Sequence, residues 1–337
     1  MIGITATIPV EILFAAEHAP VDLNNLFITS EAPTKLLAQA EAAGFSHNIC
    51  AWIKGIYATV INHDIKQVIA VTGGDCSNTI ALGEVFLSQG VTVIPFEYPL
   101  NRDRDRLWAQ MDQLRQRLHT TWEQIECQKK RLDGVRKKLK LLDKLTHAEN
   151  VVTGLENHQF LVSSSDFKGN ISRYETELDE FLRVARKRRP RKREIRLGYL
   201  GVPPVFGGFY EFIETLGARV VYNEVQRQFS MPFETDNLVD QFLEYTYPYT
   251  VEGRLRDVEQ AIKERHLHGL IHYTQTFCYR QIYDMIFRQY INLPILTLEG
   301  DRPAPLDGRT AFRIETFVEM LRDRHETSRG PDGTPKM

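Results

Sequence analysis

Cysteine is scarce in this sequence. Only four occur in 337 residues, at Cys50, Cys76, Cys127 and Cys278. This number excludes a small fold that depends on disulfides, and no two of the four form the C-x-x-C pair of a zinc ribbon or a ferredoxin motif. In a cytosolic chain of this size, we expect reduced thiols or metal ligands.

An excess of charge is also absent, because 42 Lys and Arg face 44 Asp and Glu, for a net charge of −2. Nucleic-acid binding and adsorption to a membrane surface are therefore not expected. No stretch of about 18 uncharged apolar residues occurs. The start has no basic segment, and Glu11 and Glu17 interrupt its short apolar run, so it does not resemble a signal peptide. We expect a soluble cytoplasmic protein.

Alternating strand and helix signals are abundant instead. At roughly 100–200 residues per domain, the length predicts two domains, and residues 1–100 have the pattern of a first α/β domain. The run VIAVTGGDC, residues 68–76, is typical of a buried parallel strand. A helix over 78–89 and a strand over 91–99 follow it. Cys76 is thus predicted at the carboxyl end of a strand, the edge where open α/β sheets bind ligands.

Residues 101–193 have a different character. Apolar residues spaced by three or four predict long amphipathic helices up to about residue 150, with a weak point at Gly134. A shorter helix is predicted over 178–186, and a basic run, residues 183–193, ends the segment. We interpret this run as a solvated linker; the alternative is a surface that binds phosphate groups or an acidic protein.

Residues 194–324 repeat the strand and helix alternation and predict a second α/β domain. A strand that runs into a Gly/Pro turn is expected over 194–204, and further strands over 218–224, 270–278 and 293–301. Helices are expected over 207–217, 254–269, 279–290 and 310–324. Cys278 falls at the end of the third of these strands. Residues 325–337 have the composition of a disordered tail.

Three of the four cysteines lie at the ends of predicted elements. Cys76 and Cys278 lie at predicted strand-to-helix junctions, one in each domain, and Cys50 precedes a predicted helix. Helix N-termini favour thiolates, and three thiolates at the ends of separate elements suit an iron–sulfur cubane. The commoner explanation of a free cysteine is a small buried apolar residue. Cys127, among Gln and Lys in the middle of a helix, is interpreted as structural or solvent-facing.

Several segments carry a resemblance to a known family. The sequence resembles the 2-hydroxyacyl-CoA dehydratases of the 2-hydroxyglutaryl-CoA dehydratase D-component type, which are related to benzoyl-CoA reductase subunits and double-cubane cluster proteins. The matching segments are IPVEILFAAEHAPVDL, CAWIKGIY around Cys50, GGDCSN around Cys76, GVPPVFGGFYEFIETLGARVVYNE, GLIHYTQTFCYRQIYDMIF around Cys278, and LPILTLEGDRPAPLDGRTAFRIETFVEML. They cover most of the chain except its helical middle.

The resemblance implies two Rossmann-like parallel-sheet domains joined by a helical segment, with an oxygen-sensitive [4Fe-4S] cluster in the cleft on Cys50, Cys76 and Cys278. One iron would lack a cysteine ligand. A separate ATP-dependent activator would supply one electron, and a ketyl radical on the thioester carbonyl would permit elimination of water from an acyl-CoA. Four cysteines argue against the larger double-cubane cofactor.

The resemblance leaves other functions open. One alternative is an ATP-coupled low-potential reductase of the same family that acts on another small substrate. Another is a non-catalytic electron-transfer or cluster-carrier protein. A homodimer and a heterodimer with a related subunit are both compatible with the family.

Further site candidates lie near the predicted strand ends. His272 could face the cleft as a proton donor, although a core histidine with satisfied hydrogen bonds is the commoner case. Glu97 and Glu299 end two strands and are candidates for a general base, although such carboxylates also cap helices. Gly73 and Gly74 do not belong to a dinucleotide fingerprint, and we expect them to bring backbone N–H groups close to the cluster.

Overall fold

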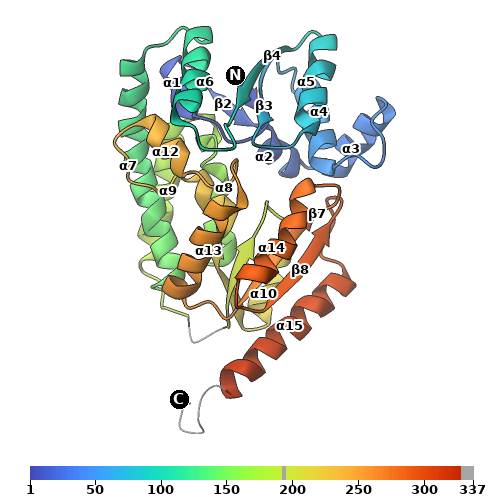
Figure 1. The fold of residues 1–337 in the computed structure, drawn as a ribbon. Helices are drawn as coiled ribbons and strands as arrows, with labels where there is room; N and C mark the ends of the chain where they lie inside the picture. The colour runs from blue at the N-terminus through green and yellow to red at the C-terminus, as the bar shows by residue number, and fades with distance from the viewer. Residues whose placement is uncertain (192–194, 328–337) are drawn as a thin grey trace.

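The computed structural model describes residues 1–191 and 195–327, which form two four-stranded sheets lying one above the other in Figure 1. Both sheets are parallel throughout, and in each the strand order is second, first, third and fourth along the chain. The strands are β1 (Ile2–Ile4), β2 (Pro20–Asp22), β3 (Gln67–Gly73) and β4 (Thr92–Glu97) in the first sheet, and β5 (Ile195–Leu200), β6 (Ala218–Asn223), β7 (Gly269–Gln275) and β8 (Ile295–Gly300) in the second. The predicted fold class, two Rossmann-like parallel-sheet domains, is confirmed.

Helices cover both faces of the first sheet. The N-terminal helices are α1 (Val10–Ala15), α2 (Leu23–Ile28), α3 (Pro33–Ala42), α4 (Ala51–Asn62) and α5 (Asn78–Ser88). Along β3, Val68 packs in a core with residues of α4 and α5, whereas Ile69 and Val71 pack in the core on the opposite face. Burial on both faces explains why this strand has a continuous β-branched run.

The helical connection is built from long antiparallel elements. It contains α6 (Arg104–Arg117), α7 (Trp122–His147), α8 (Gly154–Ser163), the short 3-10 turn η1 (Phe167–Gly169) and α9 (Ile171–Ala185). The predicted weak point at Gly134 is wrong, because α7 continues through it. One interior glycine costs only about 1 kcal/mol, and the fully buried stripe that includes Leu132, Val135 and Leu139 outweighs that cost.

One segment of the second half crosses to the first. The short helices α11 (Glu224–Phe229) and α12 (Leu238–Glu244) follow β6. Leu238, Phe242, Tyr245 and Tyr249 belong to the same core as the first sheet and the helical connection, and Figure 1 shows α12 beside α6 and α7. The segment was predicted as part of the second domain, but long-range packing places it against the first.

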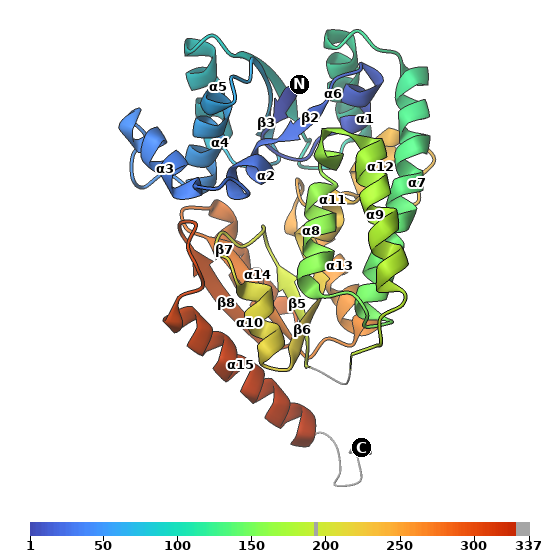
Figure 2. The same ribbon diagram turned by 180° about the vertical axis from the view of Figure 1, so that it is seen from behind.

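The remaining helices enclose the second sheet. They are α10 (Phe209–Thr215), α13 (Val251–Arg265), the 3-10 turn η2 (Tyr279–Ile282), α14 (Tyr283–Tyr290) and α15 (Gly308–Thr327). One core holds residues of α10 and α15, and another holds residues of α13 and α14; Figure 2 shows α10 on the face opposite α13 and α14. Helix α15 includes residues 325–327, so the predicted tail begins too early, and its remainder lies outside the described residues. In the described ranges, no helix has both the length and the apolar character needed to cross a bilayer.

The basic run 183–193 is held by carboxylates where the structure describes it. Arg183 pairs with Glu180, and Arg188 Nη1 lies 2.8 Å from Glu156. Arg191 reaches Glu214 beside the second sheet at 2.7 Å. These pairs agree with the interpretation as a solvated linker; residues 192 and 193 lie outside the described part.

A buried ion pair fastens the helical connection to the second half. Arg265, at the end of α13, holds Asp143 of α7 with two bonds of 3.0 and 2.6 Å. Burial opposes ionisation of this carboxyl, but the charges of Arg265 and Arg227 outweigh it and lower the pKa of Asp143 to about 2. Because the folded-state pKa lies below the ordinary value near 3.9, the pair stabilises the fold above pH 4 and loses this contribution as the pH falls toward 2.

We expect Asp143→Asn to lower the free energy of unfolding at pH 7 by about 3 kcal/mol, because it leaves Arg265 buried without a counter-charge. The difference from the wild type should shrink between pH 4 and pH 2, where the wild-type carboxyl also becomes neutral. Urea unfolding at several pH values measures both effects. Asp64→Asn is the matched control, since Asp64 forms an exposed pair with Lys66. A pH-independent difference would contradict the prediction.

Candidate functional site

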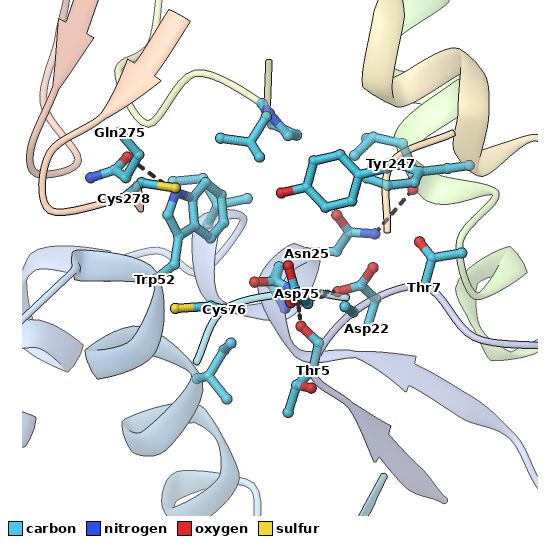
Figure 3. A pocket seen from close by; sticks show the side chains of 18 of the residues that line it. Thr5, Thr7, Asp22, Asn25, Trp52, Asp75, Cys76, Tyr247, Gln275 and Cys278 are labelled. Carbon is cyan, nitrogen blue, oxygen red and sulfur yellow. Dashed lines mark hydrogen bonds between the residues drawn. The ribbon is translucent and has the colours of Figure 1, made fainter. Parts of the chain in front are cut away.

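The three predicted cysteines come together at one cavity. Cys50 is the N-cap of α4, Cys278 is the N-cap of η2, and Cys76 lies one residue before the N-cap of α5. Cys76 and Cys278 follow β3 and β7, the third strand of each sheet, so they occupy equivalent positions in the two halves. All three line a cavity of about 380 Å³ between the halves, part of which Figure 3 shows. Cys127 is exposed on α7 and does not line it.

Each of these sulfurs accepts a backbone hydrogen bond from the residue two positions further along the chain. The donors are the N–H groups of Trp52 for Cys50, Asn78 for Cys76 and Arg280 for Cys278, and Ile53 also donates to Cys50. This pattern follows from the position of each cysteine at a helix start, where N–H groups lack partners in the helix. N–H donors to cysteine sulfur are also among the features that tune iron–sulfur clusters.

Cys50 is buried, Cys76 and Cys278 are half-buried, and the three form no disulfide. Burial raises the pKa of Cys50 to about 12 and that of Cys76 to about 11, and it also raises the pKa of Cys278. The thiols are therefore protonated near neutral pH unless a positively charged centre binds them, in which case the protons leave.

The three cysteines reach the cavity from separate elements. Among the described residues, no group of three or more His, Cys, Asp or Glu side chains is arranged to hold one metal ion. A cubane instead takes its thiolates at separate iron atoms, so the ligands can come from separate elements. The three helix starts around this cavity meet that requirement.

Hydrogen bonds join the two cysteine loops across the halves. Arg280 Nη2 donates to the Gly74 carbonyl at 2.8 Å, and the Tyr279 hydroxyl donates to the Asp75 carbonyl at 3.3 Å. On the other side of the cavity, Trp52 Nε1 donates to Gln275 Oε1 at 3.1 Å, as Figure 3 shows. The site therefore exists only when both halves are in place.

Gly74 lies close to Tyr98 and to the Pro248 loop. Its φ of +85° is in the left-handed region, and a Cβ on it would lie 2.7 Å from the Pro248 carbonyl oxygen and 2.8 Å from Tyr98 Cβ. Gly73 is packed differently, since its Cβ would lie 3.1 Å from Glu97 Cβ on the neighbouring strand. The contacts place Gly74 against Tyr98 and the Pro248 loop, and Gly73 against the neighbouring strand; that the two glycines bring backbone N–H groups close to a cluster stays a prediction.

The family of the chain follows from a comparison with known protein families. A family model described as 2-hydroxyglutaryl-CoA dehydratase, D-component, matches residues 5–321. The chain belongs to this family. The match includes all the described strands except β1, the whole helical connection and every residue that lines the cavity. A search of curated proteins finds no significant match.

The other predicted residues of this dehydratase-family chain do not line the cavity that contains the cysteines. Glu97 and Glu299 end β4 and β8 as predicted, but both are exposed outside it. His272 is buried, and its Nδ1 lies 2.7 Å from Asp284 Oδ1. It faces a space of about 20 Å³ behind Cys278. None of the three lines the cavity that contains the cysteines, and a catalytic role for them stays a prediction.

The cavity also contains polar residues that the sequence analysis missed. Asp75 and Arg280 adjoin two of the cysteines, so their sequence positions were a usable signal. Asp22, at the end of β2, and Tyr247, in the loop after α12, have no such signal. Burial raises the pKa of Asp22, and it raises that of Asp75 against the opposing charge of Arg280.

A second cavity of about 460 Å³ adjoins the first. The two share the lining residues Ile28, Leu155, His158, Gln159 and Pro204. Burial lowers the pKa of His158 to about 4, so this shared side chain is neutral near pH 7. A ligand longer than the first cavity therefore has adjoining space that carries no histidine charge.

Proposed function

We propose that this chain is the iron–sulfur component of an activator-dependent (R)-2-hydroxyacyl-CoA dehydratase, with a [4Fe-4S] cluster on Cys50, Cys76 and Cys278. The convergence of three cysteines from three helix starts on one cavity carries the proposal, and membership in the dehydratase family supports it. When bound, such a cluster would supply one low-potential electron and, with three thiolates for four irons, an open position for a substrate oxygen.

The chain's own residues would hold and enclose the substrate. Apolar side chains such as Trp52, Val202 and Phe229 form much of the cavity wall, and the bond from Trp52 to Gln275 links the two halves beside it. Such walls exclude water from a reactive centre. The adjoining second cavity offers space for the long carrier arm of a thioester whose acyl group lies near the cysteines.

Cavity size favours an enzyme over a cluster carrier. Small-molecule sites commonly have volumes of about 300–1,000 Å³, and the cavity beside the cysteines, at about 380 Å³, is within that range. A protein that only passes electrons needs no such space next to its cluster. We further propose two protein partners: an ATP-hydrolysing activator as electron donor, and a second subunit that is either another copy or a related chain.

The test begins with strictly anaerobic purification, which should give brown protein with about four irons per chain. With activator, ATP and a reductant, the protein should convert at least one of three thioesters to its enoyl-CoA. The panel consists of (R)-2-hydroxybutanoyl-CoA, (R)-2-hydroxy-4-methylpentanoyl-CoA and (R)-2-hydroxypentanedioyl-CoA. Binding of a thioester from this panel should also change the EPR signal of the cluster.

Two results would contradict this proposal in different ways. Colourless, iron-free protein with a folded circular dichroism spectrum would exclude the cluster. Reduction by the activator without a response to any thioester would favour a low-potential reductase with another substrate, or an electron carrier.

A further inference from the structure

Tyr247 presents a hydroxyl group to the cavity without a partner from the protein. It lies in the loop between α12 and α13 and is half-buried. Figure 3 shows its hydroxyl end pointing into the pocket. In the part of the chain that the structure describes, no group forms a hydrogen bond with this hydroxyl. Because Tyr247 lines the cavity, its hydroxyl is available to a ligand there.

Three nearby tyrosines differ from Tyr247, because their hydroxyls bond to the protein. Tyr98 donates to the Thr7 carbonyl at 2.8 Å, and Tyr249 donates to the Phe242 carbonyl at 2.9 Å. Tyr279, on the other half, donates to the Asp75 carbonyl. These three hydroxyls join protein segments to one another, whereas that of Tyr247 ends in the cavity.

Arg280 fixes the ring of Tyr247. Its guanidinium carbon lies 4.2 Å from the centre of that ring, and its Nη2 is held by the Gly74 carbonyl at 2.8 Å. Its Nε and Nη1 are buried without a hydrogen-bond partner. Its charged neighbours include the Asp75 carboxylate, the Arg254 guanidinium and, when ionised, the Cys278 thiol. A cation on the face of a phenol ring withdraws electron density and strengthens the hydroxyl as a donor.

We propose that Tyr247 donates a hydrogen bond to the thioester carbonyl oxygen of the substrate, the atom that gains negative charge in the reaction, and that Arg280 is the positioning residue behind it. This inference rests on the proposed function. A donor directed at developing charge in a site shielded from water raises the rate by about 10²–10³-fold. Burial keeps the pKa of Tyr247 well above its ordinary value, so the hydroxyl retains the proton that it must donate.

The decisive variant is Tyr247→Phe, which removes only the hydroxyl. With the thioester of the panel that the wild type converts fastest, kcat should fall by about 10²–10³-fold, whereas iron content and the substrate-free EPR signal stay unchanged. Tyr290→Phe is the matched control, because Tyr290 is exposed on α14 and does not line the cavity. It should behave like the wild type.

A spectroscopic measurement separates hydrogen bonding from cavity shape. The probe is the 2-deoxy counterpart of the same thioester, labelled with ¹³C at the carbonyl carbon. Because it has no hydroxyl group at C2, it cannot lose water. Isotope-edited infrared spectra should show the bound carbonyl band at a lower frequency in the wild type than in Tyr247→Phe. In Arg280→Gln the band should lie between the two, because the donor remains but the cation over the ring is gone.

Two further outcomes distinguish this inference from the proposed function. If the wild type converts a thioester and Tyr247→Phe keeps its rate within about twofold and its carbonyl band, the inference alone is overturned. If the wild type neither binds nor converts any thioester of the panel, the proposed function fails and the inference fails with it.

Discussion

Anaerobically purified Cys50→Ser, Cys76→Ser and Cys278→Ser proteins should each lose the bound cluster, so that iron falls from about four atoms per chain to nearly none. Dehydratase activity should then fall below detection. The physical reason is that each sulfur occupies a separate wall of the cavity, at its own helix start, so no neighbouring thiol can replace it. Iron analysis, visible absorption and EPR measure the loss.

Cys127→Ser is the matched control for these variants. Cys127 is exposed on α7, away from the cavity, and its replacement should retain both iron and activity. Circular dichroism must show that all four variants are folded. Full iron in any of the three cavity variants, or a loss confined to Cys127→Ser, would contradict the ligand assignment.

Gly74→Ala should have the second large effect. A Cβ at this position meets the Pro248 carbonyl oxygen at 2.7 Å, a distance too short to be accommodated without moving the loop that also carries Tyr247. We expect the free energy of unfolding to fall by about 3 kcal/mol or more, from overpacking together with the left-handed backbone. Cluster content should fall too, because the Gly74 carbonyl is the partner of Arg280.

Gly90→Ala isolates the steric part of that effect. Gly90 has a similar φ of +80°, but a Cβ there meets nothing within 4 Å. It should therefore cost only the backbone penalty of about 1–2 kcal/mol and leave the iron content unchanged. Urea unfolding and iron analysis of the two proteins provide the comparison. Equal losses of stability in both would show that the contact with Pro248 is unimportant.

Local patterns were sufficient for most of the secondary structure. The run around β3 is buried on both faces, which leaves a continuous β-branched stretch in the sequence. The apolar spacing over α7 likewise predicted a helix, and only the weight given to Gly134 was wrong. Helix boundaries were less accurate because caps and last turns depend on one or two residues.

Part of the candidate site could likewise be predicted from the sequence, and part could not. The cysteines could be found because each follows a strand or begins a helix, and the third strand of a parallel sheet delivers its carboxyl end to a predictable edge. Tyr247 could not be found, because its loop carries no periodic signal and its role depends on a cation 33 positions later in the chain that stacks on its ring. His272 was placed on the correct strand, but its hydrogen bond to Asp284 holds it outside the cavity that contains the cysteines.

By itself, the sequence determined the two parallel-sheet domains, the helical connection and the placement of three cysteines at element ends, since these follow from hydrophobic periodicity over short windows. Only the tertiary structure decided that residues 231–249 pack with the first half and that Pro248 of this segment lies close to Gly74. It also decided that a phenol backed by Arg280 points into the cavity. These features depend on which distant surfaces exclude water from each other, and that choice is made by the packing of the whole chain.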